Sequence, residues 1–542
     1  MSFTAFIVDH GARPESHVEA HKVRNMVLAK LGASTTSQVE AGHPHQVEQR
    51  IGIDAQILKP QWTTHLHPSK LPNFESQARI LRYQALMKAC IEAEISGLLL
   101  GHHADDQAET VLSRLKSGYL GPGLQGIARA GDIPECNGIY GCKSGSPRHI
   151  TVKSSKSSSV LEDQHMLVED GGVRIYRPLM DFTKAQLQAT CRDNGIRWVE
   201  DKTNQDHTLT VRNAVRNLMV LDRLPSSLNS KSLIELAEVR RRSEEAERKV
   251  VEEIYKACAV QLNMSAGTAH VRFPAHIKDL LFHKAEKDDS AKARNRAARL
   301  LRLTVMLVSS QEQIALKDME EPARRTFSFL FQEDSSPHFG ETSVAPVGKV
   351  LFQVSRTSSS ESSTDTYPIE CRIERAPPTA KDRTEQRITL ISETKRRSES
   401  FEWTTSKRQL FDGRYWIRLR YRKFNLIPGR RISIRFLQSS DIEALNQDET
   451  KYTVWKPLKD LLKTQAPGNA RFTLPAIVES HYIPLPSGDR QLIERLVALP
   501  TLNWSSAGWQ AYDRHAHRES WTWDLRYKQI DFGQSDKHEF VS

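Results

Sequence analysis

Two histidines and two adjacent carboxylates, His102, His103, Asp105 and Asp106, form the group of side chains most suited to chemistry in this sequence. They follow a short apolar run at residues 98–100. Further on, apolar residues recur at helical spacing at Ala108, Val111, Leu112 and Leu115. The pattern predicts a buried strand that turns into a helix over residues 104–116. In open α/β sheets ligands bind at the carboxyl ends of strands, and the N–H groups of a helix N-terminus suit phosphate.

A structural interpretation of the same residues stays open. An aspartate at the start of a helix often only caps it, by accepting hydrogen bonds from the first backbone N–H groups. Either Asp105 or Asp106 could have this role alone. The combination of imidazoles and carboxylates directly after a strand favours a functional site.

The elements around this group alternate between strand and helix. Residues 3–8 and 54–59 read as strands, and residues 74–94 as a long helix. Between the strands, Ser16 and Glu19 have the spacing of a capping box at the start of another helix. Strands that alternate with helices predict a parallel sheet covered by helices on both faces. The glycines at 118, 121, 123 and 126 match neither dinucleotide nor Walker spacing.

Composition changes suggest four regions. Residues 1–225 are expected to form the α/β domain, with polar insertions at 33–50 and 131–170, and Thr183 caps a helix that ends near Asn194. A helical region over 226–330, expected to contact RNA, includes helices at 230–259 and 291–307. A partly disordered linker is expected at 331–400, with a Ser/Thr-rich stretch at 354–366, before a β-rich basic domain at 401–542.

The last region contains a basic strand. Apolar and basic residues alternate with period two over residues 417–422, which places Arg418, Arg420 and Arg422 on one face. No acidic residue occurs between Arg414 and Arg435, and aromatic residues are interleaved. Such strands suit a nucleic-acid backbone and unstacked bases, although a solvated sheet face would look similar.

Bulk properties narrow the class of protein. The chain has 542 residues, is 38% hydrophobic and 26% charged, and carries a formal net charge of +11, which favours an anionic partner such as nucleic acid. No apolar run reaches the length that spans a membrane. Six cysteines without a C-x-x-C pair argue against a disulfide framework or a common zinc site.

Taken together, the motifs of the first 220 residues resemble those of the tRNA(Ile)-lysidine synthases, a family of PP-loop ATP pyrophosphatases. The matching segments, in order, are Val8-Asp9-His10-Gly11-Ala12-Arg13, the helix at 75–83 with Arg79 and Arg82, Gly101 to Thr110, Lys116-Ser117-Gly118, Arg177-Pro178-Leu179, Trp198 to Asp206, and Val211-Arg212-Asn213 with Arg216. The resemblance implies an adenine-nucleotide alpha-hydrolase-like fold, and it fades beyond residue 225.

The resemblance also implies a reaction. ATP adenylates the C2 carbonyl oxygen of the wobble cytidine of tRNA(Ile) and releases pyrophosphate, and the amine of L-lysine then displaces AMP to give lysidine. A carbonyl oxygen is a poor leaving group, which is why ATP must activate it. Mg²⁺ would offset the charge of the phosphates.

Roles for individual residues follow from the same resemblance. The catalytic residues would be His102, Asp105, Asp106 and Arg82, with Asp105 or Asp106 as the metal ligand. ATP would contact Asp9, His10 and Gly11, and lysine would contact Glu200, Asp201 and Asn204. The tRNA would contact Arg79, Arg212, Arg216, Arg418, Arg420 and Arg422.

The sequence departs from the family at one point. The phosphate loop, Ser-Gly-Gly-x-Asp-Ser, is not found, and the Gly171-Gly172 pair stands in the wrong context. We therefore expect the first strand and the pyrophosphate cradle to be missing and this chain to have little ligase activity. An N-terminally truncated enzyme and a degenerate tRNA-binding protein are the two explanations, and the otherwise complete motif set favours truncation.

Three further expectations accompany this interpretation. A tRNA thiolation enzyme is the alternative enzyme class, disfavoured because suitable cysteines are lacking. The resemblance allows a homodimer and gives no membrane partner. Lysidine belongs to bacterial and organellar decoding, so a eukaryotic chain would be mitochondrial, with its import signal absent here, and a bacterial one cytoplasmic.

Overall fold

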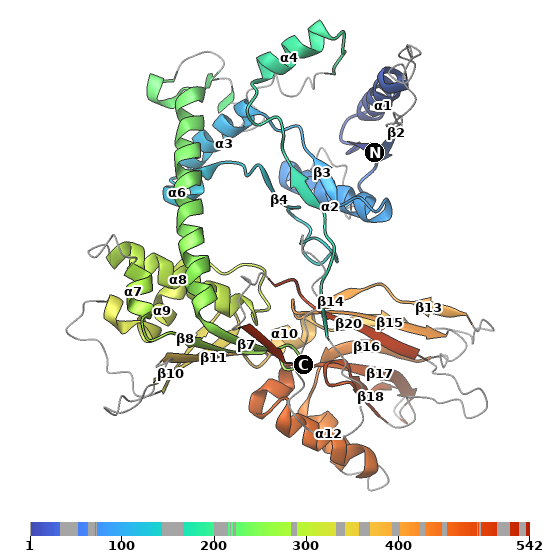
Figure 1. Cartoon of the computed structure of the whole chain (residues 1–542). Coiled ribbons are helices and arrows are strands. Elements are labelled where there is room, and N and C mark those ends of the chain that lie inside the picture. Colours follow the sequence, from blue (N-terminus) through green and yellow to red (C-terminus); the bar gives the residue numbers. More distant parts are fainter. Residues whose placement is uncertain are drawn as a thin grey trace, which may run out of the picture. The chain divides into compact units, whose positions relative to one another are not determined.

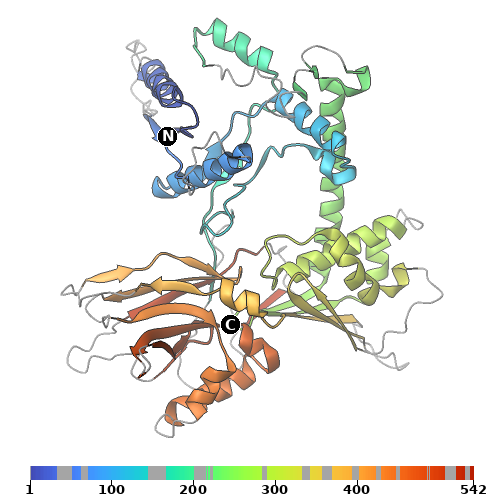
Figure 2. The same cartoon turned by 180° about the vertical axis from the view of Figure 1, so that it is seen from behind.

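A computed structural model gives the structure of the chain. It describes residues 2–32, 52–62, 71, 73–143, 166–199, 215–216, 218–219, 224–282, 290–331, 342–356, 369–392, 402–422, 429–446, 452–484, 486, 489–506, 521–530 and 538–541. The chain divides into two compact units (Figures 1 and 2). Unit 1 comprises Met1–Ser144 and Gly171–Ala246, and unit 2 comprises Gly145–Asp170 and Glu247–Ser542.

Unit 1 contains two small sheets. Its strands are β1 (Ser2–Val8), β2 (Gly52–Leu58), β3 (Gly97–Leu99), β4 (Ala130–Asp132) and β6 (Arg174–Tyr176). β1 and β2 are parallel and paired along their whole length, while β3 runs parallel to β6 and β4 antiparallel to it. The expected single parallel sheet is therefore split. Its two parts remain separate because no strand in the described residues hydrogen-bonds to both β1 and β3.

The helices of unit 1 pack on these sheets through apolar stripes. They are α1 (Ser16–Gly32), α2 (Phe74–Glu92), α3 (Ala104–Lys116), η3 (Gly121–Gln125), α4 (Lys184–Asp193), η5 (Ser226–Leu228) and the first part of α6 (Ser230–Ala257). In α2, the helical spacing of Tyr83, Met87 and Cys90 places all three in one core with Leu98 and Ile175 of the strands. A second cluster packs Ala108 and Val111 of α3 against Leu233 and Ala237 of α6.

Local signals predicted some helix ends correctly and one wrongly. The helix expected over 104–116 is α3, and Thr183 accepts a hydrogen bond from the Gln186 N–H at the start of α4, as expected. The capping box expected for α1 is not formed. The Ser16 hydroxyl instead donates to Asp9 Oδ1 at 2.8 Å, and Glu19 pairs with Arg13 at 3.1 Å.

Unit 2 is built on three sheets. The first has the strand order β21-β7-β8-β11-β10-β9, the second β12-β16-β17-β18-β19, and the third β13-β15-β20-β5 with β14 beside β15. The strands are β5 (Leu167–Val168), β7 (Ala259–Asn263), β8 (Thr268–Phe273), β9 (Thr342–Val347), β10 (Val350–Arg356), β11 (Ile369–Arg375), β12 (Ile388–Ile391), β13 (Trp403–Thr405), β14 (Gln409–Phe411), β15 (Tyr415–Arg422), β16 (Arg431–Phe436), β17 (Pro475–Pro484), β18 (Arg490–Leu499), β19 (Trp504–Ser505), β20 (Trp521–Tyr527) and β21 (His538–Val541).

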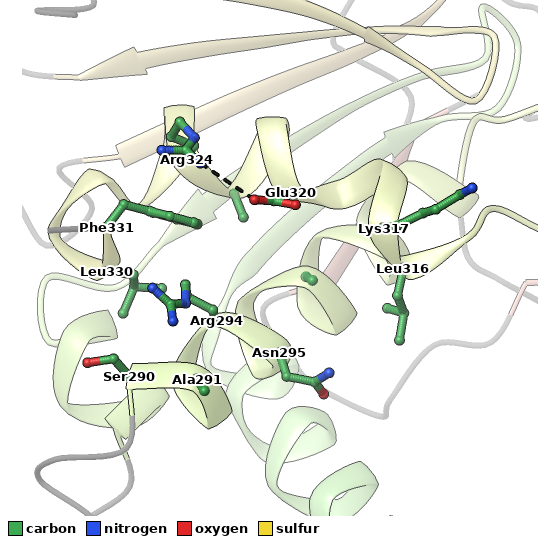
Figure 3. Close-up of a pocket in the computed structure, with 12 residues that line it drawn as sticks. Ser290, Ala291, Arg294, Asn295, Leu316, Lys317, Glu320, Arg324, Leu330 and Phe331 are labelled. Atoms are coloured by element: carbon green, nitrogen blue, oxygen red, sulfur yellow. Dashed lines mark hydrogen bonds and ion pairs between the residues drawn. The ribbon is translucent and has the colours of Figure 1, made fainter. Parts of the chain in front are cut away.

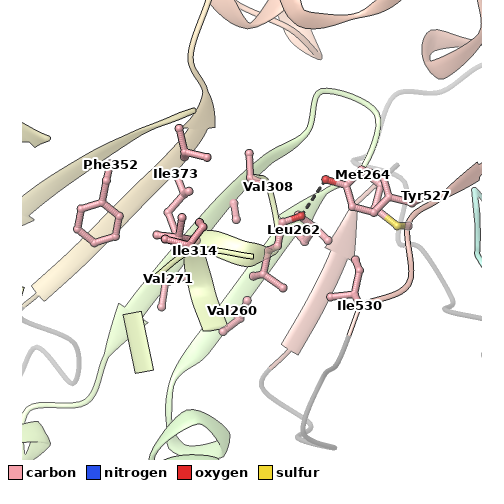
Figure 4. Packing of buried hydrophobic residues seen from close by; sticks show 14 of the residues in the cluster. Val260, Leu262, Met264, Val271, Val308, Ile314, Phe352, Ile373, Tyr527 and Ile530 are labelled. Atoms are coloured by element: carbon pink, nitrogen blue, oxygen red, sulfur yellow. Dashed lines mark hydrogen bonds between the residues drawn. The ribbon is translucent and has the colours of Figure 1, made fainter. Parts of the chain in front are cut away.

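Helices cover these sheets, and one large core joins them. They are the end of α6, α7 (Ile277–Phe282), α8 (Ser290–Met306), η6 (Leu316–Met319), α9 (Glu320–Thr326), η7 (Ser328–Leu330), α10 (Ala380–Glu385), α11 (Ser439–Asn446), α12 (Tyr452–Thr464), η10 (Gly468–Thr473) and η11 (Pro500–Leu502). Figure 4 shows part of the core, where Val271, Phe352 and Ile373 of the first sheet are buried together. The Tyr527 hydroxyl donates to the Leu307 carbonyl at 2.9 Å and so ties β20 to the end of α8.

Unit 2 differs from the expected division of the sequence. Residues 331–400, expected as a partly disordered linker, contain β9, β10 and β11, which are central to the core because their alternate residues are apolar. The expected helical region 226–330 also supplies β7 and β8. Within the expected insertion 131–170, β5 pairs with β20. The insertion at 33–50 and most of the Ser/Thr-rich stretch lie outside the described residues.

Buried ion pairs stabilise the sheets of unit 2. Arg375 and Arg414 both donate to the Asp412 carboxylate, and all three side chains are at most 2% exposed. A half-exposed pair also occurs, in which Lys349 donates to the buried Asp382 carboxylate at 2.6 Å. As to membranes, none of the helices within the described ranges combines the length and the apolar character that a crossing requires.

Candidate active site

A cavity of about 320 Å³ in unit 1 brings together side chains from α2 and from the β3–α3 connection. Its lining consists of Arg82, Tyr83, Leu86, Leu100, Gly101, His102 and Asp106. Three of the four predicted catalytic residues therefore share one cavity, although Arg82 and His102 are separated by twenty positions in the sequence. The cavity lies where β3 ends, which is the position predicted for ligand chemistry.

Asp106 has a structural contact as well as a place in this cavity. The backbone N–H of His103 donates to its Oδ2 at 3.0 Å, and His103 Nε2 lies 3.5 Å from the same oxygen. The carboxylate thus caps the first turn of α3, so the capping interpretation holds for this residue. Capping also fixes the carboxylate at the wall of the cavity.

Asp105 points elsewhere. Its Oδ2 accepts the backbone N–H of Lys184 at 2.7 Å, at the first residue of α4, and it is not among the residues that line the cavity. This bond joins the starts of two helices that are 79 positions apart in the sequence. Asp105 therefore holds α4 against α3.

The two carboxylates consequently differ as ligands for Mg²⁺. No group of three or more His, Cys, Asp or Glu side chains in the described ranges is arranged to hold a metal ion. Mg²⁺ bound with a nucleotide needs only one or two protein carboxylates, because phosphates and waters supply the remaining ligands. Asp106 at the cavity wall fits this requirement, whereas the carboxylate of Asp105 is engaged with α4.

The predicted ATP-binding residues lie in the turn after β1. Asp9 accepts hydrogen bonds from the Gly11 N–H at 3.0 Å and the Ser16 hydroxyl at 2.8 Å. Burial opposes the charge on Asp9, but these hydrogen bonds and the nearby His17 outweigh it and lower its pKa. Gly11 has φ +62°, a left-handed conformation that favours glycine. Asp9 and Gly11 thus shape the turn.

His10 interacts electrostatically with Arg82, which lines the cavity. Its pKa is lowered mainly by burial and then by the positive charge of Arg82. Its carbonyl accepts the Trp62 indole N–H at 2.9 Å, and the Trp62 ring stacks on Phe74 at 5.6 Å between centroids. The sequence analysis missed these two aromatic residues. Their only signal was an aromatic residue just after a predicted strand and another at the start of a predicted helix.

Two arginines predicted to contact tRNA are held by carboxylates within unit 1. Arg79 pairs with Glu135 at 3.0 Å. Arg216 forms a bidentate pair with Glu109 on α3, at 2.6 and 3.0 Å, and this hydrogen bonding raises the pKa of Arg216. Glu109 is only 4% exposed. The pair holds Arg216 against α3, so a structural role explains this arginine without a contact to tRNA.

The glycine-rich loop is docked on α3. The Gln107 side chain donates to the Gln125 carbonyl and accepts the Ile127 N–H, and Arg114 donates to the carbonyls of Gly123 and Gly126. These contacts use the polar face of α3 to fix the loop. Gln107 and Arg114 therefore have positioning roles that their spacing alone did not reveal.

The predicted lysine-binding residues lie outside the described residues, and so does one predicted tRNA contact. These residues are Glu200, Asp201, Asn204 and Arg212. Their roles remain predictions. Nearby, the Arg192 guanidinium lies 5.9 Å from the centroid of the exposed Trp198 ring.

Several basic residues of the acid-free stretch 414–435 pair with acids that lie outside that stretch. Arg418 donates to Asp524 at 2.8 Å. The neighbouring basic residues are engaged as well, with pairs Arg414–Asp412, Arg430–Glu479 and Arg435–Asp441. Arg420 and Arg422 differ, since each lies about 5 Å from the Trp403 ring (5.0 and 5.1 Å) and neither has a carboxylate partner within the described residues. They are the members of this strand best placed to meet an anion.

The cysteines are unsuited to sulfur transfer. Five of the six thiols are buried, and Cys191 on α4 is the exception. Burial raises the pKa of Cys90 to about 11 and that of Cys136 to about 12. Because thiolates are the reactive form, these residues do not support the thiolation alternative.

Comparison with known proteins shows what this chain is similar to in sequence. Residues 1–223 match the PP-loop domain family. The resemblance to tRNA(Ile)-lysidine synthases is confirmed. A probable tRNA(Ile)-lysidine synthase of Schizosaccharomyces pombe is 24% identical over 93% of this chain and 85% of its own length.

Bacterial relatives match a shorter part of the chain. The tRNA(Ile)-lysidine synthase of Methylobacterium nodulans is 30% identical over 44% of this chain and 51% of its own length, and that of a Bradyrhizobium strain is 29% identical over 40% and 42%. The alignment thus covers about half of the length of each of these two bacterial proteins. A solved U34-tRNA thiolase from Methanococcus maripaludis aligns with a TM-score of 0.27 at 14% identity, over 43% of this chain and 61% of that one, which is too low to establish a common fold.

Proposed function

We propose that this PP-loop protein is an ATP-dependent ligase that joins L-lysine to C2 of the wobble cytidine of tRNA(Ile). The observation that supports the proposal most is the cavity at the end of β3, where Arg82, His102 and Asp106 meet within a PP-loop domain. The names of the relatives from fission yeast and bacteria point to the same reaction.

Each side chain of the cavity suits one part of this chemistry. The Arg82 guanidinium can hold a phosphate or the adenylated base, since its planar donors match phosphate oxygens. His102 can accept the proton that the lysine amine must lose before it attacks C2. Asp106 would hold Mg²⁺, which offsets phosphate charge when bound. Tyr83 and Leu86 form the apolar part of the lining that helps to exclude water.

Other parts of the chain would bind the remaining substrates. Glu200, Asp201 and Asn204 would surround the lysine ammonium, and Arg212 would contact the tRNA backbone. In unit 2, the pair of guanidiniums beside Trp403 supports an RNA contact there, because guanidinium and aromatic groups together suit phosphates and unstacked bases. We also propose a mitochondrial site of action if the chain is eukaryotic.

The test is lysine-dependent release of pyrophosphate from ATP in the presence of tRNA(Ile), and turnover by residues 1–542 would contradict the expectation from the sequence that this chain has little ligase activity. We expect Asp106→Asn and His102→Gln to lower the turnover rate by roughly a hundredfold or more. Asp105→Asn is the matched control, because this carboxylate is engaged with α4. Equal losses in the two aspartate variants would contradict the assignment of Asp106 as the metal ligand.

A second candidate function is tRNA binding without catalysis. It is favoured by Arg420 and Arg422 beside Trp403, because guanidinium and aromatic groups can contact RNA without ATP. Binding of tRNA(Ile) without pyrophosphate release would support this function, whereas turnover would support the ligase. Absence of both binding and turnover would refute both.

A further inference from the structure

Unit 2 contains a larger cavity, which we name the α8–α9 pocket and which has a volume of about 770 Å³. It is lined by α8, η6, α9 and the residues that follow α9. The lining side chains used below are Arg294, Lys317, Glu320, Arg324, Leu330 and Phe331. Nothing in the proposed ligase reaction uses this pocket.

An aromatic ring organises two guanidiniums in the pocket. Arg324 lies 4.8 Å and Arg294 lies 5.7 Å from the centroid of the Phe331 ring. Figure 3 shows Arg324 above Phe331 and Arg294 below it, so the ring separates the two cations. Cation–π contacts of this kind hold arginines in defined positions while leaving their N–H donors available to a ligand.

The pocket has an excess of positive charge. The positive charge of Arg324 is partly offset by two carboxylates, since its guanidinium lies 3.5 Å from Glu320 and 3.9 Å from Glu321. In the part of the chain that the structure describes, neither Arg294 nor Lys317 pairs with a carboxylate. Two cationic side chains without an acidic partner in one cavity favour an anionic ligand, and guanidinium donors match the oxygens of phosphate.

The volume of the pocket and its apolar lining indicate a ligand larger than a single phosphate ion. A volume of about 770 Å³ falls within the range of small-molecule sites, roughly 300–1,000 Å³. The apolar residues of the lining are Ala291, Ala298, Leu316, Ala323, Leu330 and Phe331. They offer a surface for a flat or apolar body attached to the anionic group.

We propose that the α8–α9 pocket binds a phosphate-bearing ligand of nucleotide size, with its phosphate on Arg294, its ring against the apolar residues, and the positive charge of Lys317 on the other side of the lining adding to the attraction. The same chemistry is offered by a free nucleotide and by an unpaired nucleotide within an RNA strand. The proposal stands on unit 2 alone and does not depend on the ligase reaction.

The experiment compares two charge-matched double variants of the full chain. Arg294→Gln/Lys317→Gln removes the two pocket cations that have no carboxylate partner among the described residues, while Lys381→Gln/Arg490→Gln removes two exposed cations elsewhere in unit 2. Binding of AMP is measured by calorimetry, in an Arg82→Gln background so that AMP in the cavity of unit 1 does not contribute. Binding of a labelled pentauridylate RNA is measured by fluorescence anisotropy over a range of salt concentrations.

We expect the pocket variant to weaken one of the two probes by at least about tenfold, since charge-assisted hydrogen bonds to phosphate are strong. A loss for AMP alone identifies a free nucleotide as the ligand. A loss for RNA, with the slope of log K against log salt reduced by about 0.7 for each lost phosphate contact, identifies a strand. Unchanged binding of both probes, or an equal loss in the control variant, would overturn the proposal.

Discussion

The pair between Arg216 and Glu109 gives a prediction that separates a structural role from an RNA contact. Glu109 on α3 is 4% exposed, and both of its oxygens accept hydrogen bonds from the guanidinium. Removing one partner of a buried ion pair costs about 3–5 kcal/mol, because the other charge is left buried. The Arg216 side chain is 32% exposed, so water can replace part of its contribution. We therefore expect Arg216→Gln to cost about 2–3 kcal/mol.

Hydrogen exchange of the α3 amides, followed by mass spectrometry, measures this cost locally. Local opening governs exchange, so a cost of about 2–3 kcal/mol should speed it roughly 30- to 140-fold. Glu109→Gln should have an effect of similar sign, because it leaves the guanidinium without its carboxylate. The double variant should recover part of the loss, since no unpaired charge is then left buried. Arg192→Gln, an exposed arginine of unit 1, is the control and should change exchange little.

The opposite outcome would point to tRNA. If Arg216→Gln leaves α3 exchange unchanged while it lowers the salt slope of tRNA binding by about one, Arg216 is a phosphate contact. In that case Glu109→Gln would have no effect on tRNA binding, and the structural reasoning would be refuted.

Three further predictions concern single positions. Gly126→Ala should cost about 1–3 kcal/mol in thermal unfolding of unit 1, because φ is +68° and the added Cβ would lie 2.4 Å from the Gln107 side chain; an unchanged melting temperature would contradict this. Burial of Asp382 opposes its charge and would raise its pKa. Hydrogen bonds from the Lys349 ammonium and from the backbone N–H of Thr379 outweigh burial and lower the pKa from 3.8 to about 2. The resulting stability, about 2 kcal/mol, is present above pH 4 and is lost as the pH falls towards 2, so Asp382→Asn should flatten this part of a stability–pH curve, and an unaltered curve would count against it. Arg420→Gln should lower the salt slope of tRNA binding by about one, whereas Arg418→Gln, whose guanidinium is held by Asp524, should leave it unchanged, and equal slopes in both variants would argue against an RNA contact here.

Much of the candidate site could be predicted because its signals are local. The bounds of α3 follow from the spacing of its apolar residues, and the cap at Thr183 follows from a short motif. The grouping of His102 and Asp106 needs only a strand followed directly by a helix. Ser16 shows the limit of such signals, since the Glu19 N–H that a capping box would bind donates to the Glu15 carbonyl instead.

Contacts between distant positions could not be predicted. The basic strand looked free of acids because its partner Asp524 follows Arg418 by 106 positions. The pair of Arg216 with Glu109 spans 107 positions. The strands in 342–375 were missed for a different reason. The apolar alternation of Val350, Phe352 and Val354 was present, but the neighbouring serines and threonines suggested a linker.

The distribution of thiols has a practical consequence for following this protein in solution. Cys191 is the single thiol of the six that is not buried, and it sits on α4, whose first N–H is held by Asp105. A maleimide dye should therefore attach at one place in the natural chain, without removal of other cysteines. Its emission would then report directly whether α4 stays docked when nucleotide or RNA is added.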